Sequence, residues 1–259
     1  MAPKIAIVYY SMYGHVKQLA LAEKEGIEAA GGSATLFQVA ETLPQEVLTK
    51  MHAPPKDDSI PVLEDPAVLE QFDGFLFGIP TRYGNFPAQW KTFWDKTGGQ
   101  WQTGAFWGKY AGLFISTGTL GGGQETTAIS AMSTLVHHGM IYVPLGYKTV
   151  FPYMANVEEV RGGSPWGAGT FSAADGSRQP SKNELEVAKA QGTAFYQALA
   201  KVAAAGAIET GAGKKEDKPI GAVAPPETQK DTPAGGKPKA KAKSEKSGPC
   251  GLPTKCEVM

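Results

Sequence analysis

Cysteine is nearly absent from this chain of 259 residues: there are only two, Cys250 and Cys256, both among the last ten positions. A disulfide framework needs paired cysteines spread through the folded part of a chain. No such pair can form before position 250. The cysteine pattern therefore gives no indication of a secreted, cross-linked protein.

Long apolar runs and an excess of charge are missing as well. No stretch approaches the roughly 18 consecutive apolar residues that a membrane span requires. The formal net charge is zero, so nucleic acid is not expected as the main partner. The opening stretch MAPKIAIVYYS lacks the small-residue cleavage site of a secretory signal, and we expect it to form a first strand instead.

Aromatic residues disappear after about Gly206, where Ala, Gly, Pro and Lys dominate the composition. A segment of this kind cannot bury enough apolar surface to fold alone. We therefore predict one folded domain over residues 1–206, followed by a disordered tail over residues 207–259.

Inside the predicted domain, apolar segments rich in β-branched and aromatic residues alternate with helical patterns. The segments read KIAIVYY, ATLFQV, GFLFGIP, YAGLFIS and MIYVPLG. Short and nearly continuous apolar runs between helices are typical of a parallel sheet that is covered on both faces. The pattern predicts a doubly wound α/β fold with five parallel strands.

Two of the intervening helices have clear signatures. The first carries one apolar face, which consists of Val16, Leu19, Ala20 and Ile27. The last opens with SKNE, in which Ser181 and Glu184 are spaced as a capping box. Gly206 is expected to end this last helix.

Three loops rich in hydroxyls, glycine and backbone N–H donors follow the first, third and fourth predicted strands. They read SMYGHV, PTRYGNFPAQ and STGTLGGGQE. The carboxyl ends of parallel strands meet at one edge of a sheet, and ligands of such folds bind there. The sequence therefore predicts a ligand site where the three loops converge.

The first loop leads directly into a helix, whose N-terminus presents free N–H groups and a partial positive charge. Ser11 and the glycine-containing turn can surround a phosphate there. The loop lacks both the G-x-G-x-x-G fingerprint and the Walker motif, so it favours a mononucleotide. The alternative is an ordinary helix cap at Ser11 or His15.

The other two loops favour a flat ligand. Thr81 and Arg82 offer donors, Tyr83 offers a ring, and the glycine run lets the backbone approach closely because glycine has no Cβ. A flavin ring requires hydrogen-bond donors to its pyrimidine oxygens and to the N1 region, and aromatic walls. The alternative for the glycine run is a flexible surface loop.

At this point the sequence resembles a known family. The segments YYSMYGH, PTRYGNFPAQWKTFWDKTGGQW, STGTLGGGQETT, LVHHGMIYVPLGY, VRGGSPWGAGT and DGSRQPS look like the WrbA family of flavodoxin-like NAD(P)H:quinone oxidoreductases. The likeness runs from about Lys4 to Ala200, and the tail suggests a fungal member. It implies a flavodoxin-like fold, the cofactor FMN, NADH or NADPH as co-substrate, small quinones as substrates, and a homotetramer.

Site residues follow from the same resemblance. It places FMN on Ser11, Met12, Tyr13, Gly14, His15, Val16, Thr81, Arg82, Tyr83, Ser116, Thr117, Gly118, Thr119, Leu120, Gly121 and His137. It makes Tyr13 a nicotinamide contact and Trp101 a wall of the substrate site, with His137 beside the incoming quinone. The family loop usually reads S-T-G-T-G-G-G-Q, and the extra Leu120 leaves the glycine register open between Gly121 and Gly122.

His137 and Trp101 also have structural interpretations. A histidine at the end of a helix is often a cap, because its charge is favourable there. Trp90 and Trp94 have the helical spacing of core residues, whereas Trp101 lies among glycines and polar residues and suits a lid or an interface. The long insertion over residues 146–180 suits subunit packing.

The predicted activity is a ping-pong hydride relay, in which NAD(P)H and then a quinone occupy one slot beside the flavin and the proton comes from His137 or water. Two other classes stay open at this point. One is a flavodoxin-type electron carrier, which usually has an acidic docking face and a shorter chain. The other is a non-enzymatic flavoprotein scaffold at a membrane.

The chain ends in PCGLPTKCEVM, and its last four residues fit a prenylation box on Cys256. Cys250 offers a palmitoylation site, and a lysine run precedes it, made of Lys237, Lys239, Lys241, Lys243 and Lys246. A lipid together with a second lipid or a basic patch anchors a protein stably. We expect contact with the cytoplasmic face of a membrane and a eukaryotic source; a chance match of four residues is the alternative.

Overall fold

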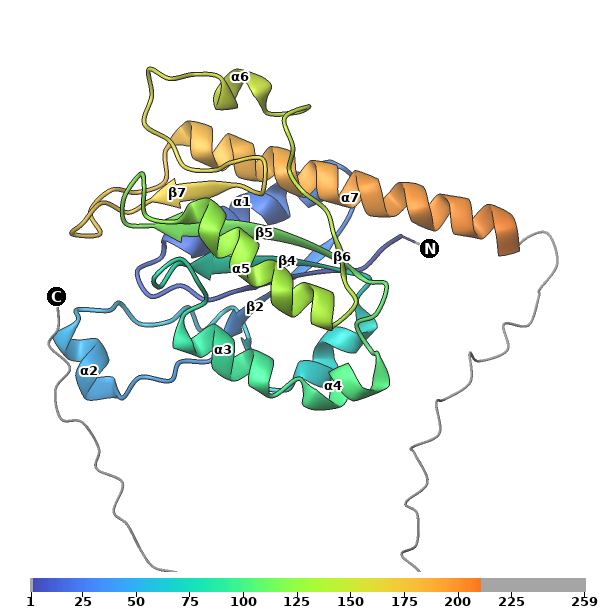
Figure 1. The fold of residues 1–259 in the computed structure, drawn as a ribbon, viewed down its shortest axis with the longest axis horizontal. Helices are drawn as coiled ribbons and strands as arrows, with labels where there is room; N and C mark the ends of the chain where they lie inside the picture. Colours follow the sequence, from blue (N-terminus) through green and yellow to red (C-terminus); the bar gives the residue numbers. More distant parts are fainter. Residues whose placement is uncertain (1, 211–259) are drawn as a thin grey trace, which may run out of the picture. The chain divides into compact units, whose positions relative to one another are not determined.

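The computed structural model describes residues 2–210, and Cys250, Cys256 and the lysine run lie outside this range. Figure 1 shows a sheet with helices on both of its faces. The strands are β1 (Ile5–Tyr9), β2 (Ala34–Val39), β3 (Val62–Leu63), β4 (Gly74–Pro80), β5 (Tyr110–Thr117), β6 (Ile141–Tyr142) and β7 (Gly169–Phe171). The helices are α1 (His15–Ala29), α2 (Gln45–Lys50), α3 (Ala88–Asp95), α4 (Gly98–Thr103), α5 (Gln124–His137), α6 (Phe151–Met154) and α7 (Lys182–Thr210), with a 3₁₀ turn at Pro66–Gln71.

The sheet is parallel throughout and has the strand order β3-β2-β1-β4-β5-β6, with β7 paired to β5. All five predicted strands are present as β1, β2, β4, β5 and β6. The order reverses between β1 and β4, which places the switch point of this doubly wound sheet between the loops that follow those two strands. The predicted flavodoxin-like α/β class is confirmed.

Two short strands were not predicted, and one of them matters for the site. β6 pairs with the beginning of β5 at Tyr110 and Ala111, whereas β7 pairs with its end, from Ile115 to Thr117. The two segments therefore act as halves of one edge strand, and residues 143–168 are inserted between them. Because β7 runs parallel to β5, the chain after β7 emerges at the same edge of the sheet as the loop after β5.

The alternation of side chains along β1 divides the interior into two cores. Ile5, Ile7 and Tyr9 pack with α1 and α7 on one face. Ala6 and Val8 face the other way, into a second core that contains the buried rings of Trp90 and Trp94, as expected from the spacing of those tryptophans. A strand that is apolar on both faces needs such a two-sided cover.

The last helix, α7, begins with the predicted capping box. The backbone N–H of Glu184 donates to the Ser181 hydroxyl at 3.3 Å, and the backbone N–H of Ser181 donates to the Glu184 carboxylate at 2.8 Å. The helix does not end at Gly206 but continues to Thr210. A glycine inside a helix costs only about 1 kcal/mol relative to alanine, and the alanines around it are the best helix formers. Within residues 2–210, no helix is both long and apolar enough to cross a membrane.

Candidate functional site

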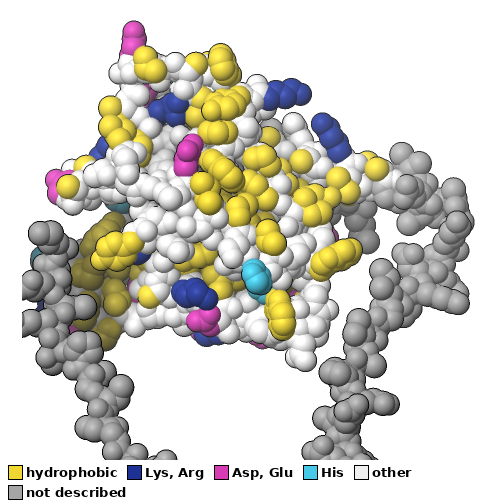
Figure 2. All heavy atoms as spheres, in the orientation of Figure 1, with side chains coloured by type: hydrophobic (Ala, Val, Ile, Leu, Met, Phe, Trp, Pro, Cys, Tyr) yellow, Lys and Arg dark blue, Asp and Glu magenta, His cyan; other side chains and the backbone are white. Residues whose placement is uncertain are grey.

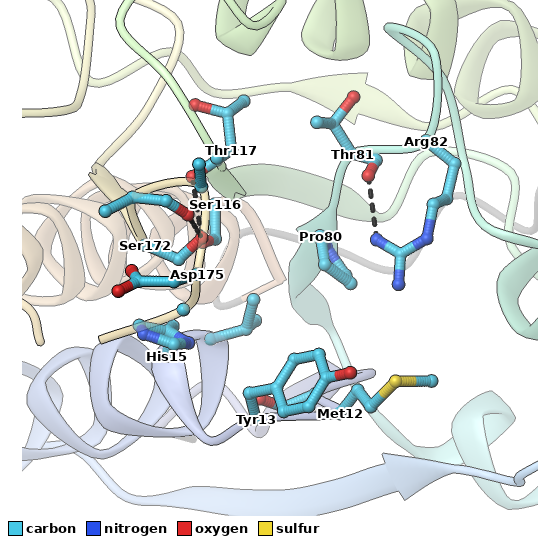
Figure 3. Close-up of a pocket in the computed structure, with 16 residues that line it drawn as sticks. Met12, Tyr13, His15, Pro80, Thr81, Arg82, Ser116, Thr117, Ser172 and Asp175 are labelled. Atoms are coloured by element: carbon cyan, nitrogen blue, oxygen red, sulfur yellow. Dashed lines mark hydrogen bonds between the residues drawn. The ribbon is translucent and has the colours of Figure 1, made fainter. Parts of the chain in front are cut away.

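A cavity of about 380 Å³ lies at the carboxyl edge of the sheet, beside the switch point. This volume is within the range of roughly 300–1,000 Å³ that small-molecule sites occupy. Figure 3 shows its lining side chains converging from four separate loops. The lining consists of Ser11, Met12, Tyr13, His15, Val16, Pro80, Thr81, Arg82, Ser116, Thr117, Gly118, Ser172, Ala173, Ala174, Asp175 and Gly176.

The loop between β1 and α1 lines one part of the cavity. Gly14 caps α1 in the left-handed conformation, with φ of 89°, and its N–H donates to the Ser11 hydroxyl at 3.1 Å. Among residues 2–210, the N–H groups of Met12, Tyr13, His15 and Val16 have no hydrogen-bond partner. Free N–H groups at a helix N-terminus attract a phosphate, so this loop can hold one.

The loop after β4 contributes Thr81 and Arg82, and a tight turn then carries the chain away. The Arg82 guanidinium donates to the Thr81 carbonyl at 2.9 Å and lines the cavity. Tyr83 and Gly84 have φ of 55° and 73°, the positive values at both central positions that define a type I′ turn. Tyr83 is consequently fully exposed at the tip and does not line the cavity.

The loop after β5 contributes Ser116, Thr117 and Gly118. Thr119, Leu120 and Gly121 turn away, and Leu120 is exposed. The requirement for glycine falls further on, because a Cβ at Gly122 would lie 2.9 Å from the Thr119 carbonyl oxygen, while Gly121 has open space around it. Of the two positions between which the sequence leaves the register open, Gly122 is therefore the one that sterically requires a glycine, and neither position lines the cavity.

A fourth loop, Ser172–Gly176, completes the cavity, and the sequence pattern does not predict its place there. The backbone N–H of Ser172 donates to the Thr117 carbonyl at 2.8 Å, which continues the pairing of β7 with β5. The Nε2 atom of His15 lies 2.9 Å from the carbonyl oxygen of Arg178, so the start of α1 is tied to this loop. The motif DGSRQPS begins within this loop in the sequence, where it belongs to the insertion that suits subunit packing. The strand before it has only 3 residues and shows no periodicity, so its pairing with β5 could not be predicted.

The charged side chains in the lining are one guanidinium and one carboxylate. Asp175 accepts from the backbone N–H of Ser177 at 3.1 Å and from its hydroxyl at 2.8 Å. These hydrogen bonds hold the pKa of Asp175 below its ordinary value, so it is ionised at neutral pH. Arg82 lies on the other side of the cavity (Figure 3). The two charges therefore give the cavity a polarity, with the cation on the β4 side.

Several predicted residues do not line the cavity of this chain. Gly14 serves as the helix cap, and Tyr83, Thr119, Leu120 and Gly121 are described above. Trp101 lies in α4 and is 60% exposed, and His137 is an exposed residue at the last position of α5. With a rise of about 1.5 Å per residue, the 14 residues of α5 hold His137 roughly 20 Å from the loop at which the helix begins.

The arrangement suits a ligand with a phosphate at one end and a flat polar ring at the other. Free N–H groups and the Ser11 hydroxyl are available to a phosphate, while Thr81, Arg82 and the backbone of Ser116–Gly118 are available as donors to ring oxygens. Gly118 leaves room for a ring to approach, since a Cβ there would have only the Ala173 carbonyl oxygen, at 3.7 Å, within 4 Å of it. The residues present therefore fit FMN.

The comparison with known families and proteins agrees with this geometry. A family model described as NADPH-dependent FMN reductase matches residues 3–150. A minor allergen of Alternaria alternata is 80% identical over 201 residues, which are 78% of this chain and 98% of the relative. An NAD(P)H quinone oxidoreductase of Candida albicans is 58% identical over 201 residues, covering 78% of this chain and all of that protein.

A solved structure shares the fold. It is described as a flavodoxin, WrbA-like protein from Agrobacterium tumefaciens, with a TM-score of 0.53 at 23% identity. The match covers 77% of this chain and 98% of that one. At this identity the likeness supports the arrangement of strands and helices described above.

Proposed function

The chain belongs to the NADPH-dependent FMN reductase family, and from this premise we propose that it binds FMN and reduces quinones with NAD(P)H. One observation carries the proposal: four loops at the switch point of the sheet enclose one cavity, and the N-terminus of α1 presents N–H groups to it that have no hydrogen-bond partner within residues 2–210. The bound FMN would accept hydride from the reduced dinucleotide and pass it to the quinone.

The residues have separable tasks in this proposal. The loop from Ser11 to Val16 binds the phosphate through its hydroxyl and its free N–H groups. Thr81 and Arg82 hold the polar edge of the ring, and the Arg82 charge stabilises negative charge that develops there. Tyr13 remains 42% exposed at the mouth of the cavity, where its ring can contact a flat substrate.

The test is a stopped-flow measurement on the purified protein reconstituted with FMN. NADH or NADPH alone should bleach the flavin absorbance near 450 nm, and a small quinone added afterwards should restore it. An electron carrier would be reduced by a protein partner and not by the free dinucleotide. A flavin that neither dinucleotide bleaches within seconds would contradict the proposed activity.

We further propose a homotetramer in which the cavity of one copy is completed by another. Neither His137 nor Trp101 lines the cavity of its own chain, yet both side chains are exposed. Figure 2 shows apolar side chains gathered on the face that carries α5. The exposed large apolar residues of α5 and the segment after it are Ile129, Val136, Ile141, Tyr147 and Phe151. Contiguous exposed apolar side chains favour a protein interface.

Mixed assemblies test the shared site. Ser11→Asp should prevent FMN binding in its own copy, and His137→Ala should remove the imidazole offered to a neighbour. Each variant alone should be poorly active. Co-expressed, they should recover activity, because a cavity of the His137→Ala copy can pair with an intact His137 of the other. A monomer by light scattering, or mixed assemblies without recovery, would contradict the shared site.

We also propose that residues 237–256 bring the protein to the cytoplasmic face of a membrane. The support is the lysine run with Cys250 and Cys256 beside it. The intact mass of the protein from its native host should show one prenyl group, with or without a palmitoyl group. Free thiols at both cysteines, with the whole protein in the soluble fraction, would contradict this.

A further inference from the structure

We propose that Lys56 and Glu41, which lie outside the FMN cavity, are positioning residues for the FMN phosphate. They hold the peptide between Ser11 and Met12 so that the Met12 N–H is directed into the cavity. The inference rests on the proposed function, since it assigns the FMN phosphate to the Ser11–Val16 loop.

Lys56 is held by three groups at once. Its Nζ atom donates to the Ser11 carbonyl at 3.1 Å, lies 4.2 Å from the centre of the Tyr10 ring, and stands 3.5 Å from the Glu41 carboxylate. Lys56 does not line the FMN cavity but a smaller hollow of about 180 Å³, whose lining also includes Ser11, Met12 and Gly14. Ser11 and Met12 line both spaces, so the loop forms the wall between them.

The geometry of the peptide between Ser11 and Met12 determines which of its two polar groups faces the cavity. There is no cis peptide bond among the described residues, so the C=O of Ser11 and the N–H of Met12 point in opposite directions. The carbonyl is directed at Lys56, on one side of the wall. The Met12 N–H is consequently directed toward the cavity, and it has no hydrogen-bond partner within residues 2–210.

Glu41 has no free capacity for a ligand, which assigns it a structural task. Its carboxylate accepts from the Tyr10 hydroxyl at 2.8 Å, from the Gln89 amide at 2.8 Å, and from the backbone N–H groups of Thr42 and Leu43 at 2.9 and 3.2 Å. These four donors come from the residue that follows β1, from α3 and from the chain after β2. Glu41 thereby fixes both the Tyr10 ring and the ammonium group that lies over it.

The charge states agree with this arrangement. Burial works to raise the pKa of Glu41, but the hydrogen bonds from Tyr10, Leu43, Gln89 and Thr42 outweigh it and hold the pKa below its ordinary value. Burial lowers the pKa of Lys56, and the neighbouring Glu41 partly offsets this. An ammonium beside an ionised carboxylate is the form that donates to a carbonyl.

The first test compares FMN with riboflavin, which lacks the phosphate. In Lys56→Met, the Kd of FMN should rise about tenfold or more, as expected for a hydrogen bond to a charged group, while the Kd of riboflavin changes less than about twofold. Lys50→Met, which removes the same charge from an exposed position in α2, is the matched control and should leave both values unchanged. Equal losses for both ligands in Lys56→Met would mean general damage to the site and would overturn the assignment.

The variant Glu41→Gln distinguishes a positioning role of Glu41 from a direct electrostatic effect of its charge on the phosphate. Removing a negative charge near a phosphate should tighten FMN binding if electrostatics alone operated. Positioning predicts the opposite, a weaker FMN complex with riboflavin affinity preserved, because Lys56 and Tyr10 lose their anchor. Tighter or unchanged FMN binding in this variant would overturn the inference. Failure of the wild-type protein to bind FMN at all would instead overturn the proposed function.

Discussion

Gly192 in α7 lies so close to Glu23 in α1 that a Cβ atom at position 192 would stand 2.1 Å from the Glu23 carbonyl oxygen. The contact is reciprocal along the same pair of helices, since a Cβ at Gly26 would stand 2.0 Å from the Lys189 carbonyl oxygen. Both neighbours are backbone atoms, which cannot rotate away. The two glycines therefore set the distance between the first and last helices of the domain.

Gly192→Ala should destabilise the protein by about 2 kcal/mol or more, because the helices must separate to admit the methyl group. Urea unfolding followed by circular dichroism measures the difference. Gly98→Ala is the control, because Gly98 has an ordinary backbone conformation and a Cβ there would have no neighbouring atom within 4 Å. There the exchange should be neutral or stabilising. Equal effects at the two positions would contradict close packing as the cause.

Glu23 should make the protein less stable as the pH rises. Its carboxyl group is fully buried and has no hydrogen-bond partner within residues 2–210, and burial raises its pKa well above the ordinary value of 4.5. The unfolded chain therefore releases this proton at a lower pH than the folded protein does. Above pH 4.5 the free energy of unfolding falls by up to about 1.4 kcal/mol per pH unit, until the pKa of the folded protein is reached.

The isosteric variant Glu23→Gln tests this effect. The free energy of unfolding of the variant minus that of the wild type should grow in favour of the variant between pH 5 and pH 8. Glu28→Gln on the exposed side of the same helix should change stability by less than about 1 kcal/mol, because its pair with Lys24 is a surface contact. A difference for Glu23→Gln that stays constant with pH would show that Glu23 is ionised in the folded protein.

His138 should have the opposite pH dependence. Its Nε2 atom lies 2.9 Å from the Thr97 hydroxyl, and its buried Nδ1 atom has no hydrogen-bond partner in the part of the chain that the structure describes. Burial, together with the neighbouring His137, lowers its pKa from 6.5. Its contribution to stability is complete above pH 6.5 and is lost as the pH falls toward the folded pKa. His138→Gln should be less stable than wild type at pH 7.5, and the gap should narrow at pH 5.5. A gap that widens on acidification would contradict a neutral imidazole.

Ser11→Asp should expel FMN while leaving the fold intact. The added carboxylate lies at the helix N-terminus, where it is electrostatically favourable for the helix but repels and crowds a phosphate. We expect the purified variant to lack absorbance near 450 nm and to unfold at a temperature close to that of the wild-type apoprotein. Ser33→Asp, at an exposed position before β2, should retain FMN. A full complement of FMN in Ser11→Asp would place the phosphate elsewhere.

Local patterns in the sequence were sufficient for the class of fold and for much of the cavity. β1, β2, β4 and β5 are long enough to show as apolar runs, and the hydroxyls and glycines that follow β1, β4 and β5 are adjacent in sequence to strands whose ends must share an edge. The capping box of α7 is likewise a local feature, because Ser181 and Glu184 are three residues apart in the sequence. Such features depend on neighbours along the chain, which the sequence displays directly.

Contacts between distant residues decided the rest. The division of the edge strand into β6 and β7 depends on pairing with opposite ends of β5, and strands of two and three residues carry no periodicity of their own. That pairing brings Ser172–Gly176 to the cavity. The separation of His137 from the cavity follows from the direction of α5, and the burial of Glu23 follows from the close approach of α1 and α7. In each case the physical cause is a position in space that residues far apart in sequence define together.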